Sequence, residues 1–265
     1  KEGQVAKIMG ELKNNFRLLP SAEISIELNP ETITEKKLLE YKLVGINRIS
    51  IGGQTMNPKI LNLLGRKHSV EDTKNAVKLA KKIGFENINV DMMLALPTQK
   101  MSDVKKMAKY LVKKGIQHIS PYSLILEPST PLYKMVLNKK VSLPSEDDSV
   151  EMYNYVFKFL TKKGYSRYEV SNFSLPDYES VHNLNYWNMG EYLAFGLAGH
   201  SFISNTRLAN TENLDEYLKE ISKDNIPVIS KEKVSLAMRK DETLMLALRT
   251  KEGLDIKEFD AKFNC

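Results

Sequence analysis

The chain has 265 residues, of which 42% are hydrophobic and 27% charged, and its formal net charge is +6. That composition is ordinary for a soluble globular protein, and the length is enough to bury a sizeable core. No apolar run approaches the roughly 20 residues of a membrane span, and no signal peptide is recognisable. The lysine doublets are spread along the chain without forming a basic stripe, which argues against a nucleic-acid partner. We therefore expect a cytoplasmic protein without stable membrane insertion.

Cysteine usage excludes two further kinds of site. The only cysteine is Cys265, the last residue, so neither a disulfide framework nor a cysteine metal site is expected. This fits a reducing compartment.

The chain begins inside a predicted helix (residues 5–16) and stops just after another, so we expect it to be a fragment of a longer protein, truncated at both ends.

Predicted strands and helices alternate through the first half of the chain. Five segments have the composition of strands: residues 24–29, 48–53, 87–97, 118–126 and 166–173. The segments between them have helical periodicity and end at caps or glycines: residues 34–45, 57–65, 70–83, 101–114 and 145–164. Repeated strand–helix units predict an α/β fold with a parallel sheet, open or closed into a barrel. In either architecture the chemistry lies beyond the carboxyl ends of the strands.

The rhythm changes beyond Phe173. A predicted loop carries the segment SVHNLNYWNMG, and a glycine-interrupted apolar stretch follows at residues 192–203. Two helices are predicted after it, over residues 213–223 and 231–248. We expect three parts: a barrel-like part over residues 1–172, an extension over 173–225, and the start of a C-terminal helical domain over 226–265.

Polar residues stand near the ends of the predicted strands. Glu27 and Asp91 each interrupt an apolar strand, and a buried carboxylate needs a cation or hydrogen-bond donors. Gly52 and Gly53 allow a ligand to approach the backbone closely, and Gln54 adds a donor and an acceptor. The alternatives are solvent-facing carboxylates and an ordinary turn after the strand. On neighbouring strands, these side chains would converge on one cavity.

Arg66 and the histidines outside the aromatic segment are further candidates. Arg66 lies in a loop after a short predicted helix, where its forked donors suit a carboxylate; the alternative is a surface arginine. His68 lies in the same loop. His118 begins a strand, which favours a structural role. His200 follows two glycines, which favours a loop hydrogen bond over ligation.

Residues 182–187 concentrate planar side chains in one short segment. His182, Tyr186 and Trp187 each join a flat ring to a polar atom, and Asn183 and Asn185 between them can fix its orientation. The segment either holds a flat ligand or forms a tight loop clamped by Trp187.

Several segments together carry a family resemblance: IELNPET, GINRISIGGQ, LGRKHS, INVDMMLALP, YSLILEPSTPLY, RYEVSNF and HNLNYW. In this order they resemble the radical S-adenosylmethionine proteins that are similar to oxygen-independent coproporphyrinogen III oxidase. Within that family, HNLNYW resembles the HNxxYW signature of the heme chaperones. The resemblance implies a partial (β/α) barrel with an extension and a C-terminal winged-helix-like domain, of which this chain holds the start.

The resemblance also implies two organic ligands. By motif position, Glu27, Gln54, Arg66 and Asp91 are expected to contact S-adenosylmethionine, with the arginine on its carboxylate. The second ligand is heme.

For heme, the resemblance assigns roles within the aromatic segment. His182 is expected to be the axial ligand of the heme iron, because a neutral imidazole binds it well. Tyr186 and Trp187 are expected to pack against the macrocycle.

The family's CxxxCxxC motif, which holds a 4Fe–4S cluster, is absent, as is its glycine-rich stretch after the first strand. We expect the cluster only in a longer parent and this chain alone to be inactive. The parent is expected to be a radical-SAM-type heme chaperone that passes heme to an acceptor protein. The alternatives are an oxygen-independent coproporphyrinogen III oxidase that uses a 5′-deoxyadenosyl radical, and a binding module without chemistry.

Overall fold

The structure is a computed structural model and describes residues 3–264. The chain divides into two compact units, residues 1–179 and residues 180–265. The finer division of the second half at residue 225 stays a prediction.

The first unit is built on one sheet with the strand order β1-β2-β3-β4-β6-β5. Its strands are β1 (Ser25–Leu28), β2 (Arg48–Gln54), β3 (Asn87–Leu94), β4 (His118–Ser123), β5 (Ser166–Glu169) and β6 (Asn172–Ser174). Its helices are α1 (Gln4–Asn15), the 3-10 turn η1 (Pro30–Thr32), α2 (Glu35–Val44), α3 (Pro58–Leu63), α4 (Val70–Lys82), α5 (Met101–Lys113), α6 (Pro131–Leu137) and α7 (Glu146–Lys162). Strands β1 to β4 are parallel, as the strand–helix alternation predicts.

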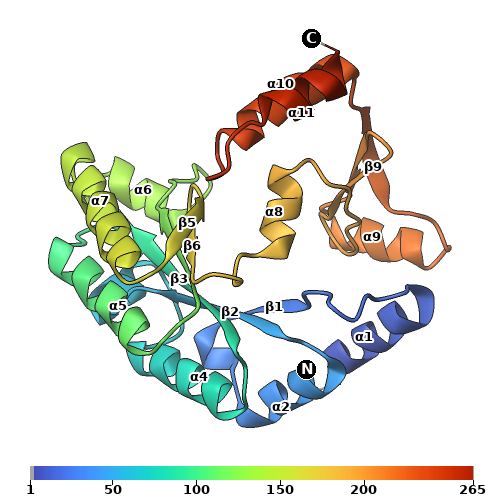
Figure 1. The fold of residues 1–265 in the computed structure, drawn as a ribbon. Helices are drawn as coiled ribbons and strands as arrows, with labels where there is room; N and C mark the ends of the chain where they lie inside the picture. The colour runs from blue at the N-terminus through green and yellow to red at the C-terminus, as the bar shows by residue number, and fades with distance from the viewer. Residues whose placement is uncertain (1–2, 265) are drawn as a thin grey trace. The chain divides into compact units, whose positions relative to one another are not determined.

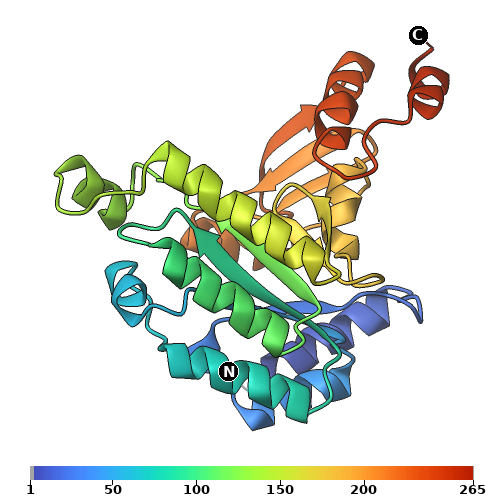
Figure 2. The ribbon, with the colours of Figure 1, turned by 60° about the vertical axis from the view of Figure 1, so that its left-hand side comes forward.

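Alternation along β3 gives the sheet two different faces. Ile88 and Val90 are fully buried in the hydrophobic core together with residues of α4, α5 and α7. These helices lie along one side of the sheet (Figures 1 and 2). Asn89 and Asp91 alternate with the core residues and therefore lie on the opposite face. One strand thus supplies both the core and a polar surface.

The helix ends follow the signals in the sequence. Ser69 and Asp72 form a capping box that begins α4, and Ser145 and Asp148 form another that begins α7. Helix α2 ends at Gly45, whose φ of 103° is open to glycine but disfavours other residues. Because these caps are local, the predicted helix boundaries in this unit are confirmed to within about two residues.

The prediction of a single fifth strand over residues 166–173 is wrong. The segment forms β5 and β6, which pair with each other in antiparallel fashion, and β6 pairs antiparallel with β4. The register shifts between Arg167 and Glu169, and the chain turns at Val170 and Ser171 without glycine or proline. The sequence therefore carries no strong turn signal at this point.

The second unit contains a three-stranded antiparallel sheet that was not predicted. Its elements are α8 (Val181–Trp187), β7 (His200–Ile203), β8 (Thr206–Asn210), α9 (Leu214–Ile221), β9 (Val228–Lys233), α10 (Leu236–Ala247) and α11 (Ile256–Phe263). The predicted helix over residues 231–248 is wrong in its first turn, because Lys231 to Lys233 pair with β8. Ser235 then caps α10 by accepting a hydrogen bond from the backbone of Met238.

The predicted loop around residues 182–187 is a helix. Ser180 caps α8 by accepting a hydrogen bond from the backbone N–H of Asn183. The helix has only seven residues. Its two internal asparagines, Asn183 and Asn185, are typical of turns, which explains why the pattern indicates a loop.

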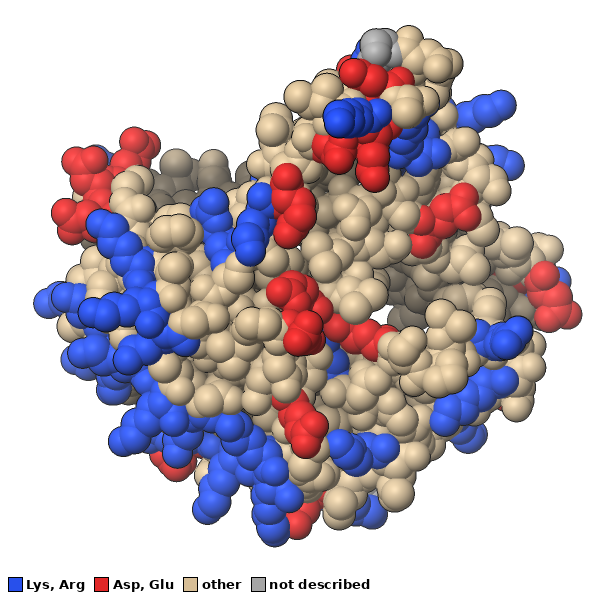
Figure 3. Space-filling model, viewed as in Figure 1, with Lys and Arg blue, Asp and Glu red and all other residues tan. Residues whose placement is uncertain are grey.

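Lysine side chains gather on the face of the molecule seen in Figure 3, where α4 and α5 lie in Figure 1. The lysines of these two helices are Lys74, Lys78, Lys81, Lys82, Lys105, Lys106, Lys109 and Lys113. This gathering was not predicted from the spread of lysines along the sequence. Within the described part of the chain, none of the helices has the length and apolar character needed to cross a membrane.

Candidate functional site

The sheet face opposite the helices carries a row of polar side chains. In the parallel register Glu27 pairs with Ser50, Ser50 with Asn89, and Asp91 with Ser120. Because residues in register on neighbouring strands share a face, the row crosses the sheet from β1 to β4.

Asp91 and Glu27 are the two carboxylates of this row that were predicted to bind a ligand, and Asp91 is the more buried of the two. Burial raises its pKa, and hydrogen bonds from Tyr122 and Asn89 act in the opposite direction. The charge of Glu27 raises the pKa further, so the two carboxylates lie in one electrostatic neighbourhood. Glu27 itself is solvent-exposed.

Tyr122 belongs to this site and was not predicted. Its hydroxyl bonds Asp91, and burial followed by the charge of Asp91 raises the pKa of Tyr122 far above its ordinary value. Arg66 acts in the opposite direction. The sequence offers only a weak signal: Tyr122 stands two residues after Ser120 and therefore lies on the same strand face.

Gly52 makes room for two of the predicted residues. A Cβ atom at this position would lie 3.1 Å from Nη2 of Arg66 and 3.1 Å from Nε2 of Gln54. Arg66 in turn donates from Nη2 to Oδ1 of Asn29, 3.1 Å away. Gly52 therefore lets the guanidinium and the amide approach the end of β2.

Gln54 combines backbone strain with an unused acceptor. Its φ is 59°, a left-handed conformation that is uncommon for residues other than glycine. Its side chain is buried, and Oε1 has no hydrogen-bond partner among the residues that the structure describes. Strain and an unpaired buried polar atom together are typical of functional positions.

The four residues predicted to contact S-adenosylmethionine are thus brought to one region of the first unit. The side chains of Gln54 and Arg66 both approach Gly52. Electrostatic interactions link Asp91 with Glu27, and both Asp91 and Arg66 with Tyr122. Two carboxylates, one guanidinium and one amide form a donor and acceptor set for a ligand with an amine, hydroxyls and a carboxylate.

Two histidines of the first unit are buried beside this region. His68 lies with Nδ1 3.7 Å from Oε2 of Glu31, and burial and then Arg66 lower its pKa. His118 is fully buried, and burial followed by the charge of Arg48 lowers its pKa to about 3. Both are therefore neutral at pH 7.

In the second unit, α8 brings His182 and Tyr186 together. The residues are four apart, so they share a helix face, and their rings meet edge to face with centroids 4.7 Å apart. Tyr186 contacts Tyr192 at 4.6 Å, and Tyr192 contacts Phe202 at 6.4 Å. The imidazole is solvent-exposed at one end of this aromatic row.

A cavity of about 190 Å³ lies beside the aromatic row. Tyr186, Tyr192 and Phe202 line it, together with Met245 and the ion pair of Arg207 with Glu242. Tyr192 and Phe202 were not predicted as site residues; the only signal was their place in the apolar stretch of residues 192–203.

Trp187 lies on another side of α8 from His182. Five helical residues correspond to about 140° around the helix axis. The guanidinium of Arg249 lies over the indole ring, 5.7 Å from its centroid.

His200 is exposed and begins β7, with Nδ1 3.0 Å from the carbonyl oxygen of Ala198. Among residues 3–264, no three His, Cys, Asp or Glu side chains form a group that could hold a metal ion.

Comparison with known proteins finds relatives along nearly the whole chain. Residues 4–111 match the model of the Radical SAM superfamily. The chain is 34% identical over 262 residues to the heme chaperone HemW of Lactococcus lactis, covering 99% of this chain and 69% of that protein. It is 33% identical to the heme chaperone HemW of Bacillus subtilis, with the same two coverages of 99% and 69%. The chain therefore spans about two thirds of the length of these relatives.

A solved structure matches the fold. Coproporphyrinogen III oxidase (HemN) of Escherichia coli, described as a radical SAM enzyme, matches 100% of this chain and 64% of its own, with a TM-score of 0.85. The sequence identity is 21%, so the likeness shows the fold alone. The predicted α/β fold of the radical SAM type is thereby confirmed.

Proposed function

The chain belongs to the radical SAM proteins of the heme chaperone HemW family, and from this membership we propose that it binds heme and hands it to an acceptor protein. The observation that carries the proposal is the pairing of His182 and Tyr186 on one exposed face of α8. We place this activity in the cytoplasm, where a chain with one cysteine stays reduced.

His182 supplies the iron ligand in this proposal. A neutral imidazole is a common axial ligand of heme iron. Tyr186 lies against the imidazole edge to face and therefore limits its rotation. Tyr192 and Phe202 continue the aromatic surface, on which a planar macrocycle can pack. Trp187, which lies under Arg249, stabilises the helix in this proposal and does not form a wall of the heme site.

S-adenosylmethionine is the second proposed ligand, and the first unit has residues that fit it. Arg66 would pair with its carboxylate, while Glu27 and Asp91 would accept from its amine and ribose hydroxyls. The unpaired Oε1 of Gln54 and the close approach of the Arg66 and Gln54 side chains to Gly52 are the structural observations that support this fit. When bound with a cluster, the group supplies the radical chemistry of the family.

A 4Fe–4S cluster does not fit the residues of this chain. Cluster iron is held by cysteine thiolates, and the chain has one cysteine. The proposed function of this chain is therefore heme binding and transfer.

The test is a titration of the chain with hemin beside iron-free protoporphyrin IX, followed by absorbance and by quenching of tryptophan fluorescence. We expect saturable binding of hemin at a defined stoichiometry and weaker binding of protoporphyrin IX, because the porphyrin lacks the iron that an imidazole ligates. Equal binding of both would contradict iron ligation. Oxidative decarboxylation of coproporphyrinogen III, measured by chromatography as a product that has lost two propionate carboxylates as CO₂, would instead favour the oxidase alternative.

A further inference from the structure

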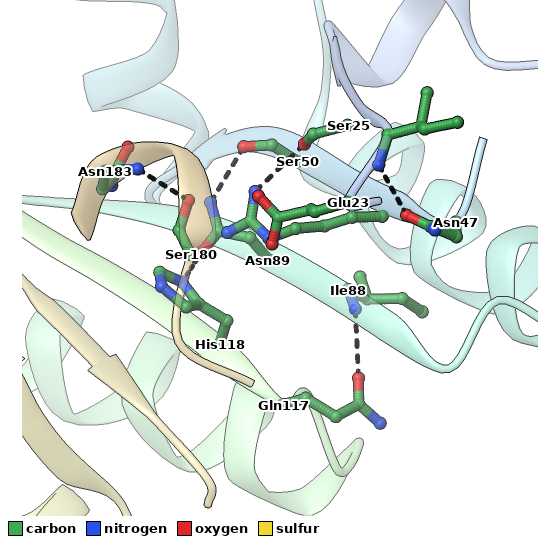
Figure 4. A network of polar contacts seen from close by, with 12 residues as sticks. Glu23, Ser25, Asn47, Ser50, Ile88, Asn89, Gln117, His118, Ser180 and Asn183 are labelled. Atoms are coloured by element: carbon green, nitrogen blue, oxygen red, sulfur yellow. Dashed lines mark hydrogen bonds and ion pairs between the residues drawn. The ribbon is translucent and has the colours of Figure 1, made fainter. Parts of the chain in front are cut away.

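The amide of Asn89 is the centre of a buried hydrogen-bond network, and Figure 4 shows Asn89 with its partners Ser50 and His118. Its Nδ2 lies 2.9 Å from Oγ of Ser50 and 2.8 Å from Oδ1 of Asp91. Its Oδ1 lies 2.9 Å from Oγ of Ser120 and 2.7 Å from Nδ1 of His118. The amide therefore uses two donors and two acceptor directions, which is its full capacity.

This geometry fixes the tautomer of His118. A carbonyl oxygen only accepts, so Nδ1 of His118 must carry the proton that it donates to Asn89. In the neutral ring Nε2 is then an acceptor, and it receives a hydrogen bond from the hydroxyl of Tyr168 over 2.8 Å. Since the ring is fully buried beside Arg48, it stays neutral at pH 7.

The carboxylate of Asp91 independently requires the same orientation of the Asn89 amide, because a carboxylate oxygen only accepts. A reversed amide would place an N–H group against the N–H of His118 and a carbonyl oxygen against the carboxylate of Asp91. Both contacts are repulsive. The donors of His118 and Ser120 therefore hold Nδ2 of Asn89 toward Asp91.

We propose that His118 is a positioning residue for the ligand site, because it orients Asn89 so that this amide holds the Asp91 carboxylate for an incoming ligand. The inference rests on the proposed S-adenosylmethionine site and adds to it a residue that does not touch the ligand. The remaining groups facing Asp91 are the hydroxyls of Tyr122 and Ser120 and the charge of Glu27. Loss of the Asn89 donor removes one of the few groups that stabilise the carboxylate form.

The experiment compares His118→Phe with His118→Asn and Tyr168→Phe in the full chain. Phenylalanine keeps much of the ring volume but has no donor. Asparagine places an N–H group where Nδ1 of histidine lies and lacks a partner for Tyr168. The probe is S-adenosylmethionine, titrated by calorimetry, and the Asp91 carboxyl is titrated by ¹³C NMR without ligand.

For His118→Phe we expect about a tenfold loss of affinity, the size of one hydrogen bond to a charged group, and a raised pKa of Asp91. His118→Asn should restore both toward the wild-type values, and ¹⁵N NMR of the wild-type ring should show the proton on Nδ1. A folded His118→Phe variant with wild-type affinity and an unchanged Asp91 titration would overturn the proposal.

The experiment distinguishes a failure of the proposed S-adenosylmethionine site from a failure of the proposed positioning role of His118. If the wild-type chain binds no S-adenosylmethionine, the proposed cofactor site fails, while the ring tautomer and the Asp91 titration still decide the positioning role. A ring proton on Nε2 would overturn it. If His118→Phe does not fold, His118→Asn and Tyr168→Phe give the same two readouts. Both variants keep an N–H group directed at Asn89. Both must therefore leave the Asp91 titration at its wild-type position.

Discussion

Asn89 and Asp91 lie two residues apart on β3, and Nδ2 of Asn89 donates to Oδ1 of Asp91 over 2.8 Å. Val90, between them, points to the other face and is fully buried in the core. The alternation of a strand therefore places a polar pair on one face and a core residue on the other. Changes at these positions separate effects on stability from effects on the ligand site.

Asp91 is expected to make stability fall as the pH rises. Burial raises its pKa in the folded state, so its contribution is fully present below its ordinary value of 3.8 and is lost as the pH rises through the folded pKa. In Asp91→Asn this loss is absent. Urea denaturation at pH steps from about 4 to 7 should show that the free energy of unfolding of the variant increases relative to that of the wild-type chain as the pH rises.

Asp72→Asn is the matched control for this pH series. Its hydrogen bonds with the backbone and side chain of Ser69 lower the pKa of Asp72, so the sign is opposite. This variant should be less stable than the wild-type chain at pH 7, with the gap closing as the pH falls. A difference between wild-type chain and Asp91→Asn that is the same at every pH would contradict the account.

Adjacent glycines should respond differently to alanine. In Gly53→Ala the new Cβ lies 2.9 Å from Cγ1 of Val90 and 3.1 Å from Cε of Met107, inside the core. We expect a loss of about 1–3 kcal/mol in the free energy of unfolding, as for other overpacked cores. Gly52→Ala instead meets the ends of the Arg66 and Gln54 side chains, which can move.

Gly52→Ala should therefore keep most of its stability and lose affinity for S-adenosylmethionine. Chemical denaturation and calorimetric titration of both variants check the pair. Equal losses of stability in the two variants would show that the two faces of β2 do not differ in this way.

Backbone strain at Gln54 can be isolated with two variants that both lack its amide. At a φ of 59°, glycine is unstrained and alanine is not. Gln54→Gly should therefore be more stable than Gln54→Ala by about 1 kcal/mol, while both bind S-adenosylmethionine equally weakly. The comparison uses urea denaturation and calorimetry. Binding as tight as that of the wild-type chain in either variant would remove the Gln54 amide from the site.

Substitutions of Tyr186 and Trp187 in α8 are expected to have different effects on heme binding. Tyr186 contacts the imidazole of His182, whereas the ring contact of Trp187 is with Arg249. Tyr186→Ala should weaken hemin binding and broaden the heme absorption band, since the imidazole loses a neighbour. Trp187→Phe, with circular dichroism as the control for folding, should leave the band in place; a larger effect at Trp187 would reverse the assignment.

Much of the first unit could be predicted because its signals are local. Alternation in β3, the Ser69 cap and the Gly45 helix end are each readable over a few residues. The polar residues Glu27 and Asp91 were also found, because a charge in an apolar strand is conspicuous. Tyr122 was missed because a tyrosine at a strand end is unremarkable until its hydroxyl is seen on Asp91.

The second unit was predicted less well because its structure depends on contacts distant in sequence. Lys231 to Lys233 look helical next to α10 but pair with Thr206 to Leu208 of β8. The short helix α8 has few residues from which to recognise a period. The network around His118 was likewise beyond the sequence, since Ser50, Asn89 and Tyr168 come from three different strands.

The most direct test of the proposed function is a hemin titration of the wild-type chain, His182→Ala and His200→Ala, followed at the heme absorption band. His200 is the matched control, because it is an exposed histidine of the same unit outside the aromatic row. We expect His182→Ala to lose affinity or shift the band and His200→Ala to behave as the wild-type chain. Equal binding by all three proteins, or a loss confined to His200→Ala, would contradict His182 as the iron ligand.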